Sequence, residues 1–198
     1  MATYLPPGIT GYEGRVEEAI DLKNKTLWLC FCRAETAWPT TLTTDDDNPP
    51  SPLPTDAEDD EPYLYIKAEY KTLVRPVAIE VFEATDPLLR VAIGSGRPDV
   101  APVYYIYESS DATAYENGSR WLYMRGRLDV AAGIHPPGVF RQIKVYSGLV
   151  PASGEQAATW LLPDHVDDRG KMRWIRNYPR TIVSDAEVKV QHIVIEKR

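Results

Sequence analysis

Residues 121–130 read Trp-Leu-Tyr-Met-Arg-Gly-Arg-Leu-Asp-Val, and this stretch decides the class of fold. Its apolar residues Leu122, Met124, Leu128 and Val130 are separated by even numbers of positions, with arginine and aspartate between them. Successive side chains of a β-strand point to opposite faces of a sheet, so these apolar side chains share one face. We therefore expect a strand that packs one face against a hydrophobic core.

Strand patterns recur on both sides of this stretch. Residues 73–82 form one such run, and Pro76 within it implies an edge position or a bulge, because proline has no N–H to donate. The apolar residues that share one face of this run are Leu73, Val77, Ile79 and Val81. The other predicted strands are residues 26–33, 88–93, 103–107, 140–146, 159–162 and 188–195.

These runs are joined by turn-rich segments such as 94–98 and 135–138. About eight short strands at this spacing predict a mainly β fold, a two-layer antiparallel β-sandwich with long loops and at most one or two short helices. The best helix candidate is residues 14–23, where Val16 and Ile20 share a face. The length suits a single domain over residues 1–198.

The last predicted strand, residues 188–195, becomes apolar on both faces towards its end. Such runs are typical of strands that are covered on both sides. We favour a central position in a sheet, and contact with another subunit is the alternative.

Residues 34–66 carry much of the negative charge. The net charge of the chain is −7, yet this segment holds nine acidic residues and no lysine or arginine. Six prolines in the same segment prevent a regular helix or an interior strand. We predict an acidic, proline-rich loop within the domain, which is either solvated and extended or a strap that orders against a neighbouring subunit.

Cys30 and Cys32 are the only cysteines and lie two positions apart in the predicted strand 26–33. Neighbouring side chains on one face of a strand have a poor geometry for a mutual disulfide, and no second Cys or His pair completes a metal site. We expect two buried, reduced thiols, consistent with assembly in a reducing cytoplasm.

Motifs for catalysis are absent from the sequence. It has no Gly-rich phosphate loop and no nucleophile elbow, and His135, His165 and His192 are scattered. The acidic clusters 45–47 and 59–61 lack the alternating spacing and central glycine of a calcium loop. No apolar run approaches the roughly 18 residues of a membrane helix. We predict no enzyme activity, no catalytic, cofactor-binding or metal-binding residues, and no membrane insertion.

Residues 169–183 form a basic stretch without an acidic residue, in which Trp174 and Tyr178 lie among the cations. Cations interleaved with aromatics can bind nucleic acid, but the negative charge of the whole chain argues against it. We favour a strand whose charges face solvent or a neighbouring subunit. In one hypothesis this stretch meets the acidic loop of a neighbouring copy.

Three stretches follow the pattern of a known family. Residues 27–38 and 48–56 join an apolar strand, which ends at Arg33, to a tryptophan and a Pro-Pro-x-Pro run. Residues 138–143 read Gly-Val-Phe-Arg-Gln-Ile, and residues 170–182 read Gly-Lys-Met-Arg-Trp-Ile-Arg-Asn-Tyr-Pro-Arg-Thr-Ile. In order and spacing they resemble the dimeric baseplate wedge subunit of T-even-type contractile bacteriophages.

This chain departs from that family at several points. Cys32 and Ala37 replace a glycine and a proline of the family pattern, and Val139 is inserted in the second stretch. Residues 63–118 have no match, and the family's proteins are longer, so the chain looks like a shortened version.

The resemblance implies a virion component of the tail baseplate, assembled in the host cytoplasm and without catalysis. Such a subunit helps to assemble the wedge around the hub and couples host attachment to tail contraction. The implied partners are other baseplate and tail proteins, further copies of the chain in a homodimer or a six-fold assembly, and tail fibre proteins, but not nucleic acid. The alternative is a fibre-attachment or receptor-binding β-sandwich, in which Tyr104, Tyr105, Tyr107 and Trp121 line a carbohydrate surface.

Overall fold

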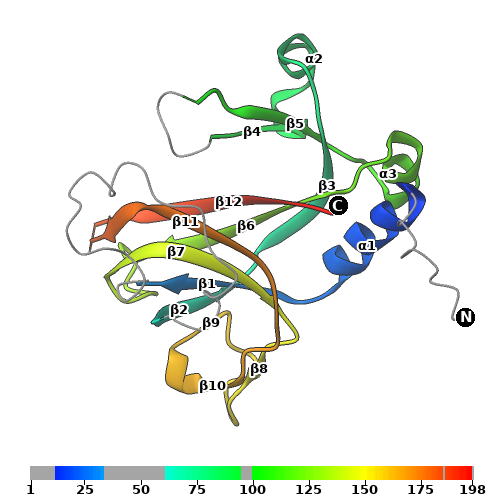
Figure 1. Ribbon diagram of the computed structural model, residues 1–198. Helices are drawn as coiled ribbons and strands as arrows, with labels where there is room; N and C mark the ends of the chain where they lie inside the picture. Colours follow the sequence, from blue (N-terminus) through cyan, green and yellow to red (C-terminus); the bar gives the residue numbers. More distant parts are fainter. Residues whose placement is uncertain (1–11, 34–60, 95–99, 185, 198) are drawn as a thin grey trace, which may run out of the picture.

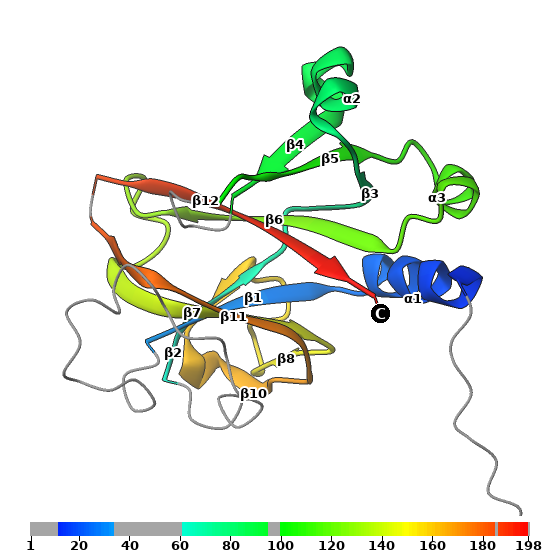
Figure 2. The same cartoon turned by 45° about the horizontal axis from the view of Figure 1, so that its top comes forward.

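The computed structural model describes residues 12–33, 61–94, 100–184 and 186–197, and these form a mainly β structure (Figure 1). Two five-stranded antiparallel sheets lie face to face (Figure 2). In order across the first sheet, the strands are β11 (Lys171–Val183), β7 (Gly138–Ser147), β1 (Leu27–Cys32), β2 (Pro62–Lys67) and β9 (Trp160–Leu161). In the second sheet they are β12 (Val188–Glu196), β6 (Trp121–Asp129), β3 (Tyr70–Pro76), β5 (Val103–Tyr107) and β4 (Arg90–Ile93).

Smaller elements complete the described structure. A two-stranded sheet pairs β8 (Val150–Pro151) with β10 (Val166–Asp168). The helices are α1 (Tyr12–Asn24), α2 (Ile79–Ala84) and α3 (Asp111–Asn117), with the 3-10 turns η2 (Pro87–Leu89) and η3 (Pro163–His165). The β-sandwich prediction is confirmed, but the described residues form three α-helices where at most one or two were expected, and α2 and α3 were not predicted.

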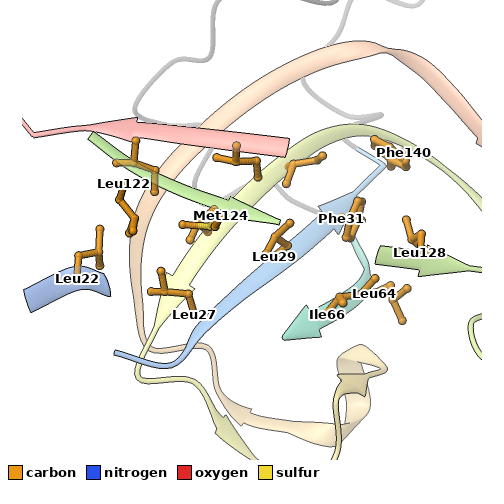
Figure 3. Close-up of a cluster of buried hydrophobic side chains, with 14 of the residues drawn as sticks. Leu22, Leu27, Leu29, Phe31, Leu64, Ile66, Leu122, Met124, Leu128 and Phe140 are labelled. Atoms are coloured by element: carbon orange, nitrogen blue, oxygen red, sulfur yellow. The ribbon is translucent and has the colours of Figure 1, made fainter. Parts of the chain in front are cut away.

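The core lies between the two large sheets (Figure 3). The predicted apolar face of β6 is confirmed, because Leu122, Met124 and Leu128 are all buried in this core. Across from β6 lies β1, which contributes Leu29 among others. A Cβ on Gly126 would lie 2.8 Å from a methyl carbon of Leu29, so the glycine allows the two sheets to approach closely.

Strand β1 is buried along its whole length. Its odd-numbered residues join the main core, and its even-numbered residues join a second apolar cluster on the other face of the sheet. That second cluster includes Cys30 and Cys32, whose sulfur atoms lie 3.4 Å apart as buried free thiols. The prediction of two buried thiols is therefore confirmed.

Helix α1 covers one end of the sandwich (Figure 2). It extends the helix predicted over residues 14–23 and buries Val16, Ala19 and Leu22 in the core. Predicted strands 26–33, 103–107, 140–146 and 159–162 also occur, with ends shifted by no more than two residues.

The prediction of a strand over residues 73–82 is wrong in its second half. Strand β3 ends at Pro76, and the chain then turns into α2, which buries none of its side chains. Ile79 and Val81, assigned to a core face, are 42% and 46% exposed. The strand ends at Pro76 because proline has no N–H to donate to the hydrogen-bond ladder of the sheet.

The predicted acidic loop lies mostly at residues 34–60, outside the described part of the chain. Its last residues were wrongly assigned, because Pro62–Lys67 form β2 and bury Leu64 and Ile66 in the core. Pro62 is the first residue of this strand, a position where proline is tolerated.

Strand β12 is an edge strand of its sheet, so the favoured central position for residues 188–195 was wrong. Ile193 and Ile195 face the core, whereas Val188 and Val190 are 45% and 41% exposed. The final apolar run therefore reflects burial of alternate residues at the end of the strand.

Candidate functional site

A small lobe projects from the sandwich at the far edge of the second sheet (Figures 1 and 2). The lobe comprises residues 77–94 and 103–107, which form α2, η2, β4 and β5. Neither α2 nor η2 contains a buried residue. The lobe is therefore attached to the second sheet, but its helix and turn contribute no buried side chain to the core.

Local contacts give the lobe a defined shape. The Phe82 ring packs on Tyr104 at 4.8 Å between centroids, and the Arg90 guanidinium lies 4.4 Å above the same Phe82 ring. Arg90 also donates a hydrogen bond to the Phe82 carbonyl. Asp86 caps η2, because its carboxylate accepts from the Leu88 N–H at 2.9 Å.

Several large apolar side chains of the lobe are exposed. Leu88 and Leu89 at its η2 turn are 83% and 54% exposed, and Ile79, Val81 and Val103 are also exposed. The neighbouring Leu88 and Leu89 expose apolar area at one turn, and exposed apolar patches are typical of protein–protein contact sites. The lobe is therefore the first candidate interaction surface.

A second candidate surface is a groove beside the connection between β6 and β7. The groove has a volume of about 580 Å³. Its lining is almost entirely apolar: Val130, Ala131, Gly133, Ile134, His135, Pro136, Pro137, Trp160 and Leu162. Ile134 is 48% exposed in this groove. A smaller cavity of about 230 Å³ shares Ile134 and His135 with it.

His135 and Asp129 hold the wall of the groove in place. The Asp129 N–H donates to His135 Nδ1 at 2.9 Å, and the Ala132 N–H donates to the Asp129 carboxylate at 3.0 Å. The His135 ring packs edge-on against Trp160 at 5.6 Å. Burial lowers the pKa of His135, so the neutral, hydrogen-bond-accepting imidazole is favoured.

Three of the four aromatic residues of the carbohydrate-surface alternative, Tyr105, Tyr107 and Trp121, share one face of the second sheet, because Val74 pairs with both Tyr107 and Trp121, and Tyr104 points to the other face. Tyr104 packs on Phe82 within the lobe, whereas Tyr107 packs on Tyr123 at 5.4 Å on the other face of the same sheet. Trp121 lies under the Arg120 guanidinium at 4.8 Å. These rings pack on neighbouring side chains, as cross-strand aromatic pairs commonly do.

The predicted basic stretch forms β11, a long edge strand of the first sheet. Arg173 donates to the Ser147 hydroxyl at 2.6 Å, and the Arg176 guanidinium lies 5.2 Å above the Tyr178 ring. Trp174 and Tyr178 are half-buried against the core. The aromatic residues of this stretch therefore pack against the core and do not form an exposed surface on which bases could stack.

The three histidines lie in separate environments. His192 Nδ1 is hydrogen-bonded to the Tyr123 hydroxyl at 2.8 Å, and His165 Nδ1 lies 3.5 Å from a Glu155 carboxylate oxygen. Among the described residues, no group of three or more His, Cys, Asp or Glu side chains could hold a metal ion. No described helix is long and apolar enough to span a membrane.

Residues 8–196 match a family model described as baseplate wedge 3 tail fiber network component. A search of curated proteins found no match.

Proposed function

This chain belongs to the baseplate wedge 3 tail fiber network component family and is a structural component of a phage baseplate, and from that premise we propose how it works there. It helps to assemble the wedge around the tail hub and joins that wedge to neighbouring baseplate and tail fibre proteins. It is not an enzyme. It occupies the baseplate in several copies, and it assembles in the host cytoplasm, where a reducing environment suits the free thiols of Cys30 and Cys32.

The apolar lobe is the observation that carries this proposal. A subunit with a purely mechanical role needs a rigid body and surfaces that bind other proteins. The single packed core that both sheets, α1 and α3 share provides the body. The lobe, the groove and the edge strands β11 and β12 provide the surfaces.

A rigid body with docking surfaces at separate edges also suits a role in contraction. Closely packed cores move as units and pass displacement from one contact to the next. A subunit held by a fibre protein at one surface and by the wedge at another would couple host attachment to tail contraction in this way.

Fibre attachment through a carbohydrate- or receptor-binding face is the second candidate. The words "tail fiber network" in the family description favour contact with fibre proteins. The packing of Tyr107 on Tyr123 and of Tyr104 on Phe82 does not favour a sugar-binding face. We therefore keep fibre contact as part of the structural role.

The experiment is genetic complementation followed by electron microscopy of the particles. Phage that lack this gene should give tails without complete baseplates, and the wild-type gene should restore them. A variant with Leu88→Glu and Leu89→Glu in the lobe should fold but restore few complete baseplates. The matched variant Val150→Glu, at a residue that is 48% exposed on β8, should restore them fully. Finding the protein in the capsid, or finding particles that lack it yet infect normally, would contradict the proposal.

A further inference from the structure

We propose that a polar pocket at the start of β11 binds a phosphate monoester. The pocket has a volume of about 700 Å³ and shares no lining residue with the groove beside β6 and β7. It lies where the connection from α1 to β1 meets the end of β7 and the start of β11. Its lining residues are Lys25, Thr26, Ser147, Gly148, Leu149, Asp168, Gly170, Lys171 and Arg173.

The charges of the pocket match a dianion. Lys25, Lys171 and Arg173 supply three positive charges and Asp168 supplies one negative charge, so the lining carries a net charge of +2. A phosphate monoester carries about −1.5 to −2 near neutral pH. A single carboxylate would neutralise only half of the charge, and a phosphate is therefore the better match.

The three cations are available to a ligand. Within the part of the chain that the structure describes, none of them makes an ion pair. Arg173 Nε donates to the Ser147 hydroxyl at 2.6 Å, which holds the guanidinium in place while its terminal nitrogens keep their donor capacity. A planar guanidinium fork fits the oxygens of a phosphate group.

A β-bulge positions Arg173 at the pocket. Met172 pairs with Tyr146 and Trp174 pairs with the adjacent Val145, so Arg173 is the extra residue of the bulge. As a result, Met172 packs in the second apolar cluster and Trp174 packs against the main core, with Arg173 between the two faces of the sheet. Bulges of this kind re-aim a side chain and are common next to functional sites.

Further lysines lie behind the pocket. Lys71 Nζ donates to the backbone carbonyl of Lys25. Burial lowers the pKa of Lys71, and the nearby cations Lys67 and Lys23 lower it further, although Lys23 is paired with Asp111. Cations that repel one another in this way attract an anion to the surface beside them.

The test is isothermal titration calorimetry of the purified full-length chain with inorganic phosphate and with glycerol phosphate. Both should bind at low ionic strength, glycerol should not, and the affinity should fall as salt is added, because exposed charges are screened. Arg173→Gln should weaken binding at least about tenfold, because it removes a charged donor fork. Lys189→Gln removes the same charge from the surface of β12, outside the pocket, and should leave the affinity unchanged.

Asp168→Asn separates a change in binding from a loss of folding. The asparagine keeps an oxygen that can accept from the Gly170 N–H but removes the one negative charge of the pocket, so phosphate should bind several-fold more tightly. A damaged fold could not produce this gain. Phosphate should also bind more tightly at pH 7.5 than at pH 5.5, because its second pKa is about 6 and the dianion forms as the pH rises.

Vesicles distinguish a free phosphate monoester from a lipid headgroup. Co-sedimentation compares vesicles that contain phosphatidic acid with vesicles of phosphatidylcholine alone. Binding to the soluble phosphates without vesicle binding identifies a free ligand, and vesicle binding that Arg173→Gln abolishes identifies a headgroup. Absence of binding to every phosphate, or binding that Arg173→Gln and Asp168→Asn do not change, would overturn the proposal. These measurements do not depend on where the protein lies in the virion, so they test the pocket separately from the proposed function.

Discussion

Glu108 is a buried carboxylate that follows β5 and connects it to β3, to the end of α3 and to the segment before β6. Its side chain is 3% exposed and lies 3.3 Å from Arg75 Nε. It accepts hydrogen bonds from the Ser119 hydroxyl and, at 2.9 Å, from the Asn117 amide. The cost of burying this carboxylate is offset only while its hydrogen-bond donors and the neighbouring cation remain.

Replacement of Glu108 by alanine should destabilise the fold by about 2–3 kcal/mol, because the hydrogen-bond donors and the cation around it lose their acceptor. Urea denaturation measures this loss. Glu108→Gln keeps one acceptor oxygen and should cost less than alanine. Glu80→Ala on the exposed surface of α2 is the matched control and should change stability by less than about 0.5 kcal/mol. An equal effect of the two alanine variants would contradict this role for Glu108.

The lowered pKa of His135 predicts how the free energy of unfolding depends on pH. Burial lowers its pKa in the folded state, against the opposing effect of Asp129 and Glu69, and it also lowers the pKa of His192. Because the unfolded chain then binds more protons, this contribution is complete above the unfolded pKa of about 6.5 and is lost as pH falls through the folded pKa.

Urea midpoints for the wild type should therefore decrease from pH 7.5 to pH 5.5. His135→Gln retains a side-chain acceptor for the Asp129 N–H but does not titrate, so its midpoint should decrease less over the same interval. Parallel decreases in the two proteins would show that His135 does not contribute.

At the scale of elements, the alternation in residues 121–130 was sufficient to predict β6 and its core face. The same rule failed at residues 77–82, where alternate apolar residues lie on a helix that faces solvent. Periodicity identifies which residues share a face but not whether that face is covered. The lobe was not predicted for this reason, because Ile79 and Val81 were assigned to the core-facing side of a strand.

The groove could not be predicted either. Residues 135–137 were correctly placed between strands, although Gly138 already begins β7. A local turn pattern cannot show that Trp160, from a strand distant in sequence, packs against His135. Only the three-dimensional pairing of β9 with β2 brings these residues together. Surfaces made by residues far apart in sequence leave no local pattern in a single chain.

Gly170 illustrates a motif residue whose role became clear only in the structure. It lies immediately before β11 in the stretch that resembles the family, and its φ angle is +73°. A Cβ here would lie 2.4 Å from the Ser147 carbonyl oxygen, a backbone atom that cannot move aside easily. The Asp168 carboxylate accepts from the Gly170 N–H at 2.8 Å, which fixes the turn before the strand.

Gly170→Ala should therefore destabilise the fold by more than about 2 kcal/mol, from the strained φ angle together with the steric clash. Gly133→Ala is the matched control, because Gly133 has φ +67° but no atom within 4 Å of the added carbon. It should cost only the conformational strain, about 1 kcal/mol. Thermal denaturation of both variants measures the difference, and equal losses would exclude the steric contribution.

On the scale of the whole molecule, most described elements share one core, and the lobe does not. Strands of both large sheets, α1 and α3 all contribute side chains to that core. Elements joined in one core usually unfold together. We therefore propose that the chain is a single cooperative domain that carries an independently accessible lobe.

Hydrogen exchange tests this division of the molecule. Amides of β1, β6 and β7 should exchange only through global unfolding, whereas amides of α2 should exchange faster by local opening, since α2 buries no side chain. Circular dichroism and tryptophan fluorescence should report the same unfolding midpoint, because Trp28 lies in the sandwich. Leu88→Glu should leave that midpoint unchanged, because Leu88 is 83% exposed. Protection of α2 equal to that of β6 would mean that the lobe belongs to the cooperative unit and would contradict this division.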